Sequence, residues 1–175
     1  MAETRLARRA FGRSPTSDRG QSLVEVALAL PLLVFTLLGG ADMARAFAVQ
    51  LAVQNGARAA AESTALQATP TGLEASAHAQ DEMNRTPGMN VSGACTQSGT
   101  VWTCGGATVT VAFTQADGTS TCTGASSTAV AGTSSVATPC YAKVRVQYAF
   151  STIVPWPGLP HTFQLDRTTM YRRYE

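Results

Sequence analysis

The chain has 175 residues, a formal net charge of +2 at pH 7 and 45% hydrophobic residues. This length allows one membrane segment and one small domain of about 90 residues. The small net charge hides an asymmetry, because the first twenty residues hold five arginines against two acids. Nucleic-acid binding would need such a basic cluster on a folded domain, so the composition argues against it.

The first nineteen residues contain these arginines, a Ser/Pro/Thr stretch and no apolar periodicity. They are therefore predicted to be disordered. Basic residues next to a membrane segment stay on the cytoplasmic side. We expect a cytoplasmic leader over residues 1–20 and a translocated, periplasmic C-terminal part.

Residues 26–41 carry no formal charge and are dense in Leu, Val and Ala. Together with residues 21–25 they make a helix of about 20 residues, roughly 30 Å long, which can cross a bilayer. Glu25 interrupts this segment near its N-terminal end, where an acid costs less than the about 2.5–3.5 kcal/mol expected at mid-membrane. The sequence predicts a single transmembrane helix over residues 21–41.

A cleaved secretory signal peptide would have an apolar run of about 7–15 residues and an A-x-A-like site. The run here is longer and residues 39–44 form only a weak site, so a retained helix is favoured. A plain signal anchor, in which Glu25 is a favourable acid in the first helical turn, remains open.

Residues 20–25, Gly-Gln-Ser-Leu-Val-Glu, and the apolar residues 27–33 resemble the N-terminus of TadE-like proteins. These are minor pilins or pseudopilins of the Tad (Flp) pilus machinery. The resemblance continues through residues 42–47 and 53–60, and residues 168–175 resemble the closing strand of that family. The stretch from about 85 to 140 carries no motif.

The resemblance implies that a membrane prepilin peptidase cleaves after Gly20 and leaves Gln21 as the mature N-terminus. A residue without a side chain lets a protease approach the backbone closely. Glu25 lies one helical turn from the new amine, and opposite charges attract strongly in a low dielectric. In pilin-like proteins the position matching Glu25 is taken to pair with a neighbouring subunit's amine. An interfacial acid without a partner is the alternative.

The implied partners are the peptidase, another Tad pseudopilin, the major Flp pilin and the bacterial inner membrane. The protein would act in pilus initiation or assembly, and its entry into the filament or the pilus tip stays open. The alternative is a signal-anchored periplasmic binding or adhesion module unrelated to pili.

Thr36, Gly40 and Ala44 recur at four-residue spacing, a small-xxx-small stripe that lets another helix approach. A helical stalk is expected over residues 42–86, broken at residues 69–72 and resumed as a short helix over residues 73–85. Apolar residues in its first part approximate one helical face, and one i,i+3 ion pair is expected. The face comprises Ala44, Phe47, Ala48, Leu51 and Val53, and the pair is Asp42 with Arg45.

From residue 89 the pattern changes to period two, which indicates strands. The candidates are residues 101–103, 108–113, 143–150 and 163–171, with an irregular Ser/Thr-rich stretch over residues 116–138 and a Pro-rich connector around Trp156. The predicted class is α+β. A long transmembrane helix continues as a helical stalk, and residues 87–175 form a small disulfide-bearing antiparallel sheet domain.

The sequence has four cysteines, Cys95, Cys104, Cys122 and Cys140, and none of them forms a C-x-x-C motif. The two histidines do not lie at the spacing of zinc ligands, so a zinc site is not expected. In a translocated domain an even number of cysteines suggests disulfides. Three pairings are possible. We favour Cys95 with Cys104, across a hairpin, and Cys122 with Cys140, across the Ser/Thr-rich stretch.

Catalytic motifs such as G-x-S-x-G, H-E-x-x-H and a phosphate-binding Gly-rich loop do not occur in the sequence. The adjacent acids Asp81 and Glu82 would point to different sides of a helix and could not flank one substrate. We do not expect the protein to be an enzyme or to bind a cofactor.

Overall fold

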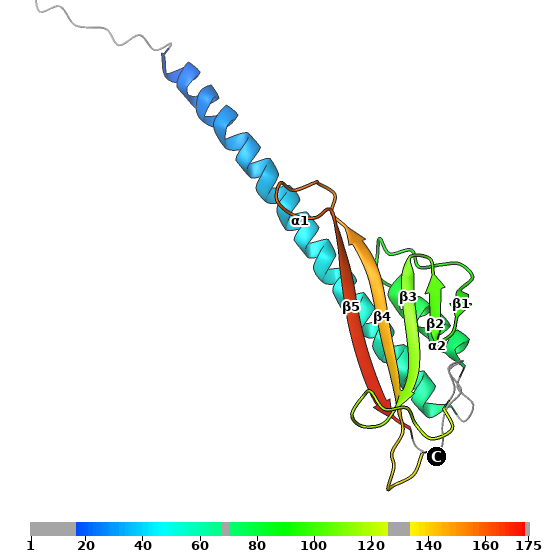
Figure 1. Cartoon of the computed structure of the whole chain (residues 1–175). Helices are drawn as coiled ribbons and strands as arrows, with labels where there is room; N and C mark the ends of the chain where they lie inside the picture. The colour runs from blue at the N-terminus through cyan, green and yellow to red at the C-terminus, as the bar shows by residue number, and fades with distance from the viewer. Residues whose placement is uncertain (1–16, 68–70, 126–133, 174–175) are drawn as a thin grey trace, which may run out of the picture. The chain divides into compact units, whose positions relative to one another are not determined.

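The computed structural model describes residues 17–67, 71–125 and 134–173. Within these ranges two helices are followed by five strands (Figure 1). The chain divides into two compact units, Met1–Gly40 and Ala41–Glu175. The predicted stalk, residues 42–86, therefore belongs to the same unit as the sheet. A long apolar helix followed by a small antiparallel sheet is the expected α+β class.

Helix α1 runs over Ser17–Leu66 and includes Pro31. Its start differs from the expected disorder of residues 1–19, because residues 17–19 are helical, while residues 1–16 lie outside the described ranges. Extending an existing helix costs far less than nucleating one, which explains why the helix continues backwards past Gly20.

The N-terminal part of α1 is long and apolar enough to cross a membrane, with a mean hydropathy of 2.2 in its most apolar window. None of this window is buried inside the protein, unlike the core helix of a soluble domain. The large exposed apolar side chains include Leu23, Leu28, Leu30, Leu32, Leu33, Phe35 and Leu37. So extended an apolar surface requires apolar surroundings, and the helix fits a single-pass membrane protein.

Helix α2, Gly72–Asn84, lies close to the predicted 73–85. Its N-cap is Thr71, whose hydroxyl oxygen accepts a hydrogen bond from the backbone N–H of Glu74 at 3.2 Å. The Thr71 hydroxyl in turn donates to the Glu74 carboxylate at 2.9 Å. These contacts satisfy the first turn of the helix and fix where it begins.

The sheet is an antiparallel meander in the order β1-β2-β3-β4-β5. The strands are β1 Thr96–Ser98, β2 Val101–Cys104, β3 Ala107–Thr114, β4 Tyr141–Ser151 and β5 Thr162–Arg172. The last four correspond to the four predicted strands. Strand β1 was not predicted, because its three residues are polar and exposed and show no alternation.

In the second unit the two helices lie on one face of the sheet (Figure 1). The core pairs larger side chains of the sheet, such as Val144, Val146 and Phe150, with very small ones of α1. The buried hydrophobic residues of α1 are Val49, Ala52, Val53, Ala57, Ala60, Ala61 and Ala65.

The apolar face expected on this part of α1 is not the face that packs on the sheet, although Val53 is buried and Ala48 is partly buried. Phe47 and Leu51 remain 64% and 44% exposed, and Ala44 is also exposed. Small side chains allow α2 and the sheet to approach the helix closely, so the alanine-rich face is the one that packs. Size complementarity, and not side-chain hydropathy alone, decides the buried face.

Gly56 shows how close this packing is. A Cβ atom at this position would lie 2.8 Å from Met83 Cγ and 3.1 Å from the Ala79 carbonyl oxygen. We expect Gly56→Ala to lower the free energy of unfolding of the second unit by about 1–3 kcal/mol, as overpacking does. The measurement is urea unfolding of the detergent-solubilised chain, followed by near-UV circular dichroism.

The matched control is Gly40→Ala on the same helix, where a Cβ would meet no atom within 4 Å. This variant should leave the unfolding midpoint of the second unit unchanged. Equal midpoints for the two variants would contradict the close approach of α2 to α1.

Both disulfides join the cysteines in the favoured pairing. Cys95 and Cys104 have a Cα–Cα distance of 4.4 Å, and Cys122 and Cys140 one of 5.7 Å. The second bridge closes most of the stretch predicted to be irregular. In that stretch residues 126–133 lie outside the described ranges, and Thr121 forms an isolated bridge with Thr114.

Removing the second disulfide in the variant Cys122→Ser/Cys140→Ser should destabilise the second unit by about 3 kcal/mol, because the unfolded chain regains the entropy of an open loop. Urea unfolding measures this loss. In the wild-type chain, maleimide should add no mass before reduction and four labels after it. Four labels without reductant would contradict both bridges.

Candidate functional site

The predicted processing site lies in the first turns of α1. A Cβ at Gly20 would meet no atom within 4 Å, and Gly20, Gln21 and Glu25 are all exposed. The amide Nε2 of Gln21 donates to Glu25 Oε1 at 3.3 Å. Positions 21 and 25 thus share one side of the helix. An amine created at Gln21 by cleavage would start within one turn of the carboxylate.

The predicted packing stripe also lies on α1. Thr36, Gly40 and Ala44 are each exposed, and the Thr36 hydroxyl donates to the Leu32 carbonyl at 2.8 Å. This local bond satisfies the hydroxyl within its own helix, so Thr36 can face an apolar partner or lipid without an unpaired donor.

A second cluster forms around Asp42, the residue that follows the predicted membrane segment. The expected pair with Arg45 is present, with Nη1 and Oδ1 separated by 3.4 Å. Asp42 also accepts hydrogen bonds from the loop between β4 and β5, which was not predicted. The donors are the N–H groups of Ile153 at 2.8 Å and Val154 at 3.4 Å, and the indole Nε1 of Trp156 at 3.1 Å.

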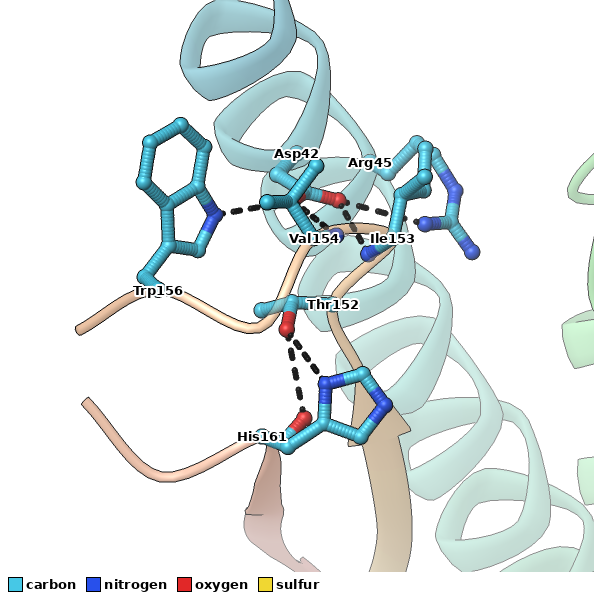
Figure 2. Close-up of polar contacts among 7 residues, drawn as sticks. All are labelled: Asp42, Arg45, Thr152, Ile153, Val154, Trp156 and His161. Atoms are coloured by element: carbon cyan, nitrogen blue, oxygen red, sulfur yellow. Dashed lines mark hydrogen bonds and ion pairs between the residues drawn. The ribbon is translucent and has the colours of Figure 1, made fainter. Parts of the chain in front are cut away.

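Figure 2 shows how the loop surrounds this acid. The indole N–H of Trp156 points at the Asp42 carboxylate from one side, and Arg45 reaches it from the other. At the base of the loop, the backbone N–H of Thr152 donates to the carbonyl of His161 at 3.0 Å. The Thr152 hydroxyl also lies 2.9 Å from His161 Nδ1. The loop is therefore closed on itself and fixed to α1.

These donors stabilise the ionised form of Asp42. The backbone N–H of Ile153 lowers the pKa of Asp42 most, and burial opposes this effect. Trp156, Val154 and the positive charge of Arg45 lower the pKa further. Only 5% of Asp42 is exposed, so the acid is covered by the residues that bind it.

At the C-terminal end of α1, Arg173 also connects the helix to the sheet. It is buried, and its Nη2 donates to the carbonyl of Gln67 at 3.3 Å, directly after α1. Its backbone N–H donates to the Cys140 carbonyl at 2.8 Å, and its guanidinium lies 5.6 Å from the centre of the Phe113 ring. The end of β5 is thereby connected to the end of α1.

The described ranges contain no cluster of metal-binding side chains. No group of three or more His, Cys, Asp or Glu side chains within them could hold an ion. Asp42 joins α1 to the β4–β5 loop, and Arg173 joins the end of β5 to the residue after α1.

The contribution of Asp42 can be measured through pH. Because its folded pKa is lowered, its stabilising effect is present above the unfolded pKa of about 3.9 and is lost as the pH falls through the folded value. We expect the midpoint of thermal unfolding to fall below about pH 4 more steeply in the wild type than in Asp42→Asn. The variant should also unfold earlier at pH 7.

Asp117 provides the control, since Ser120 and Thr119 lower its pKa in a turn between β3 and β4. Asp117→Asn should also make the fall of the unfolding midpoint below about pH 4 less steep. It should not release the β4–β5 loop, so the fluorescence emission of Trp156 should remain as in the wild type. An Asp42→Asn chain with the wild-type profile would contradict the assigned role of this acid.

One comparison with known proteins gives a match, and it lies within helix α1. Residues 20–62 match the family model described as TadE-like protein, which confirms the resemblance over this segment. The resemblance of residues 168–175 lies outside the match and stays a prediction. No curated protein and no solved structure matches the chain. Over residues 20–62, which include Glu25 and Asp42, the chain is thus similar to TadE-like proteins.

Proposed function

We propose that the protein is a minor pilin or pseudopilin of a Tad (Flp) pilus system. The observation that carries this proposal is the TadE-like match, which starts at Gly20 and covers the exposed apolar part of α1. A prepilin peptidase cleaves the Gly20–Gln21 bond and removes the arginine-rich leader. The bond lies in a helix in the uncleaved chain, so the first turn must unwind for the protease.

After cleavage the amine of Gln21 and the carboxylate of Glu25 provide opposite charges at one end of an apolar helix. A carboxylate in a bilayer gains strongly from an ammonium partner, either its own or that of a neighbouring subunit. The exposed stripe of Thr36, Gly40 and Ala44 gives a second contact for another helix. The function is association of helices within the membrane, without catalysis.

The partners in this proposal are the peptidase, a second Tad pseudopilin and the major Flp pilin. The leader lies in the cytoplasm, the helix crosses the inner membrane, and the sheet unit with its two disulfides lies in the oxidising periplasm. The bridges Cys95–Cys104 and Cys122–Cys140 favour this compartment.

The first test is the N-terminal sequence and intact mass of the membrane-extracted chain. We expect a start at Gln21, and Gly20→Leu should prevent cleavage because a large side chain keeps the protease from the backbone. A start at Met1 or Ala2 in the wild type would make the protein an uncleaved anchor and overturn the pilin mechanism. A start near residues 41–45 would mean a secreted domain.

Glu25→Gln tests assembly separately from insertion. The neutral side chain should insert at least as well, since a charged acid near the end of the segment costs up to the about 2.5–3.5 kcal/mol expected at mid-membrane. Surface pili counted by electron microscopy should be lost. Glu62→Gln, an exposed acid later on α1, is the matched control and should leave pili unchanged. Normal piliation with Glu25→Gln would favour a periplasmic binding or adhesion module on a simple anchor.

A further inference from the structure

We infer that the β4–β5 loop, residues 152–161, lies in the headgroup region of the membrane that α1 enters, and that its hydrogen bonds to Asp42 fix it there. This inference rests on the membrane segment of the proposed function but not on cleavage or pilus assembly. It assigns the loop a lipid surface as its partner.

The position of Asp42 along the helix is the first argument. Asp42 directly follows the predicted membrane segment, residues 21–41, and one helical residue rises only about 1.5 Å. Any group hydrogen-bonded to its carboxylate therefore lies close to the level at which that segment leaves the hydrocarbon. Ile153, Val154 and Trp156 are such groups.

The composition of the loop fits that level. Residues 146–165 contain no Asp, Glu, Lys or Arg, so the whole loop can leave bulk water without burying a formal charge. Trp is enriched at membrane interfaces, where its ring lies among headgroups. Two further side chains of the loop, Ile153 and Leu159, are 55% and 60% exposed although both are apolar.

The backbone of the loop is also prepared for surroundings with little water, where an unpaired N–H is costly. Four of its N–H groups donate within the protein, those of Thr152, Ile153, Val154 and Leu159. Three more positions, Pro155, Pro157 and Pro160, have no N–H to satisfy.

The indole of Trp156 follows the same rule. Its N–H is bound to Asp42, so the ring can contact lipid without an unpaired donor (Figure 2). The exposed apolar side chains and the bound indole together fit a loop that faces lipid.

The test is quenching of Trp156 fluorescence by lipid. The full-length chain is reconstituted in vesicles of phosphatidylcholine with or without bromine on the upper acyl carbons, and vesicle flotation verifies insertion. The Trp156 signal is the difference between the wild type and Trp156→Phe. We expect brominated lipid to reduce it about twofold, since interfacial rings contact these carbons.

The second tryptophan is an internal reference. Trp102 is 2% exposed in the core, so the emission that remains in Trp156→Phe should be the same in both lipids. In Asp42→Asn the quenching of Trp156 should weaken. In Asp117→Asn, a change in the connection at the opposite end of β4, it should persist.

The outcomes separate this inference from the proposed function. A chain that floats with the vesicles but shows no quenching of Trp156 keeps its membrane segment, and its loop faces water or another protein, which overturns the inference. A chain that does not float overturns both. Quenching in a chain whose N-terminus is uncleaved supports the inference and overturns the pilin mechanism alone.

Discussion

The carboxylate of Asp42 accepts hydrogen bonds from residues 111, 112 and 114 positions later in the chain. A covered carboxylate is stable only if donors replace the water it loses, so the loop must present its N–H groups in one arrangement. That arrangement sets where β4 ends and β5 begins relative to α1. The position of the β4–β5 loop on α1 thus depends on one acid at the start of the second unit.

A charge of opposite sign serves the other end of the same helical segment. Arg173 binds the carbonyl of Gln67 and lies over Phe113, so the last turn of α1 and the end of β5 meet. Between the two charged groups the contact is made by small side chains, such as Ala57 and Ala61. Polar contacts at the ends define the register of helix on sheet, and alanine packing defines how closely they approach.

Features repeated along the sequence were predictable, and features made by distant residues were not. The apolar segment and the period-two strands each depend on neighbouring residues, and the structure has both. The predicted break at residues 69–72 lies partly outside the described ranges, and α1 ends at Leu66 while α2 begins at Gly72. Strand β1 is too short and polar to show a pattern. The buried face of α1 was mistaken because Phe47 and Leu51 dominate its hydropathy, while fit against α2 and the sheet selects Ala52 and Ala60.

Only one of the contacts of Asp42, the ion pair with Arg45, was predicted from the sequence. The ion pair with Arg45 follows from helical spacing, whereas the bonds to the loop require the fold. A signal does exist: an acid directly after an apolar segment, together with an indole among prolines, offers an acceptor and a donor that each need a partner. Recognising such pairs needs knowledge of the strand topology that joins them.

The meander has a consequence for the order of events during synthesis. Each strand pairs with its neighbour in sequence, yet β5 and Arg173 must return to a helix more than 100 residues earlier. The ribosome makes α1 first, so its contacts with β5 and Arg173 form only after the rest of the sheet has been synthesised. A chain stalled before β5 would lack these contacts and would remain a substrate for proteolysis.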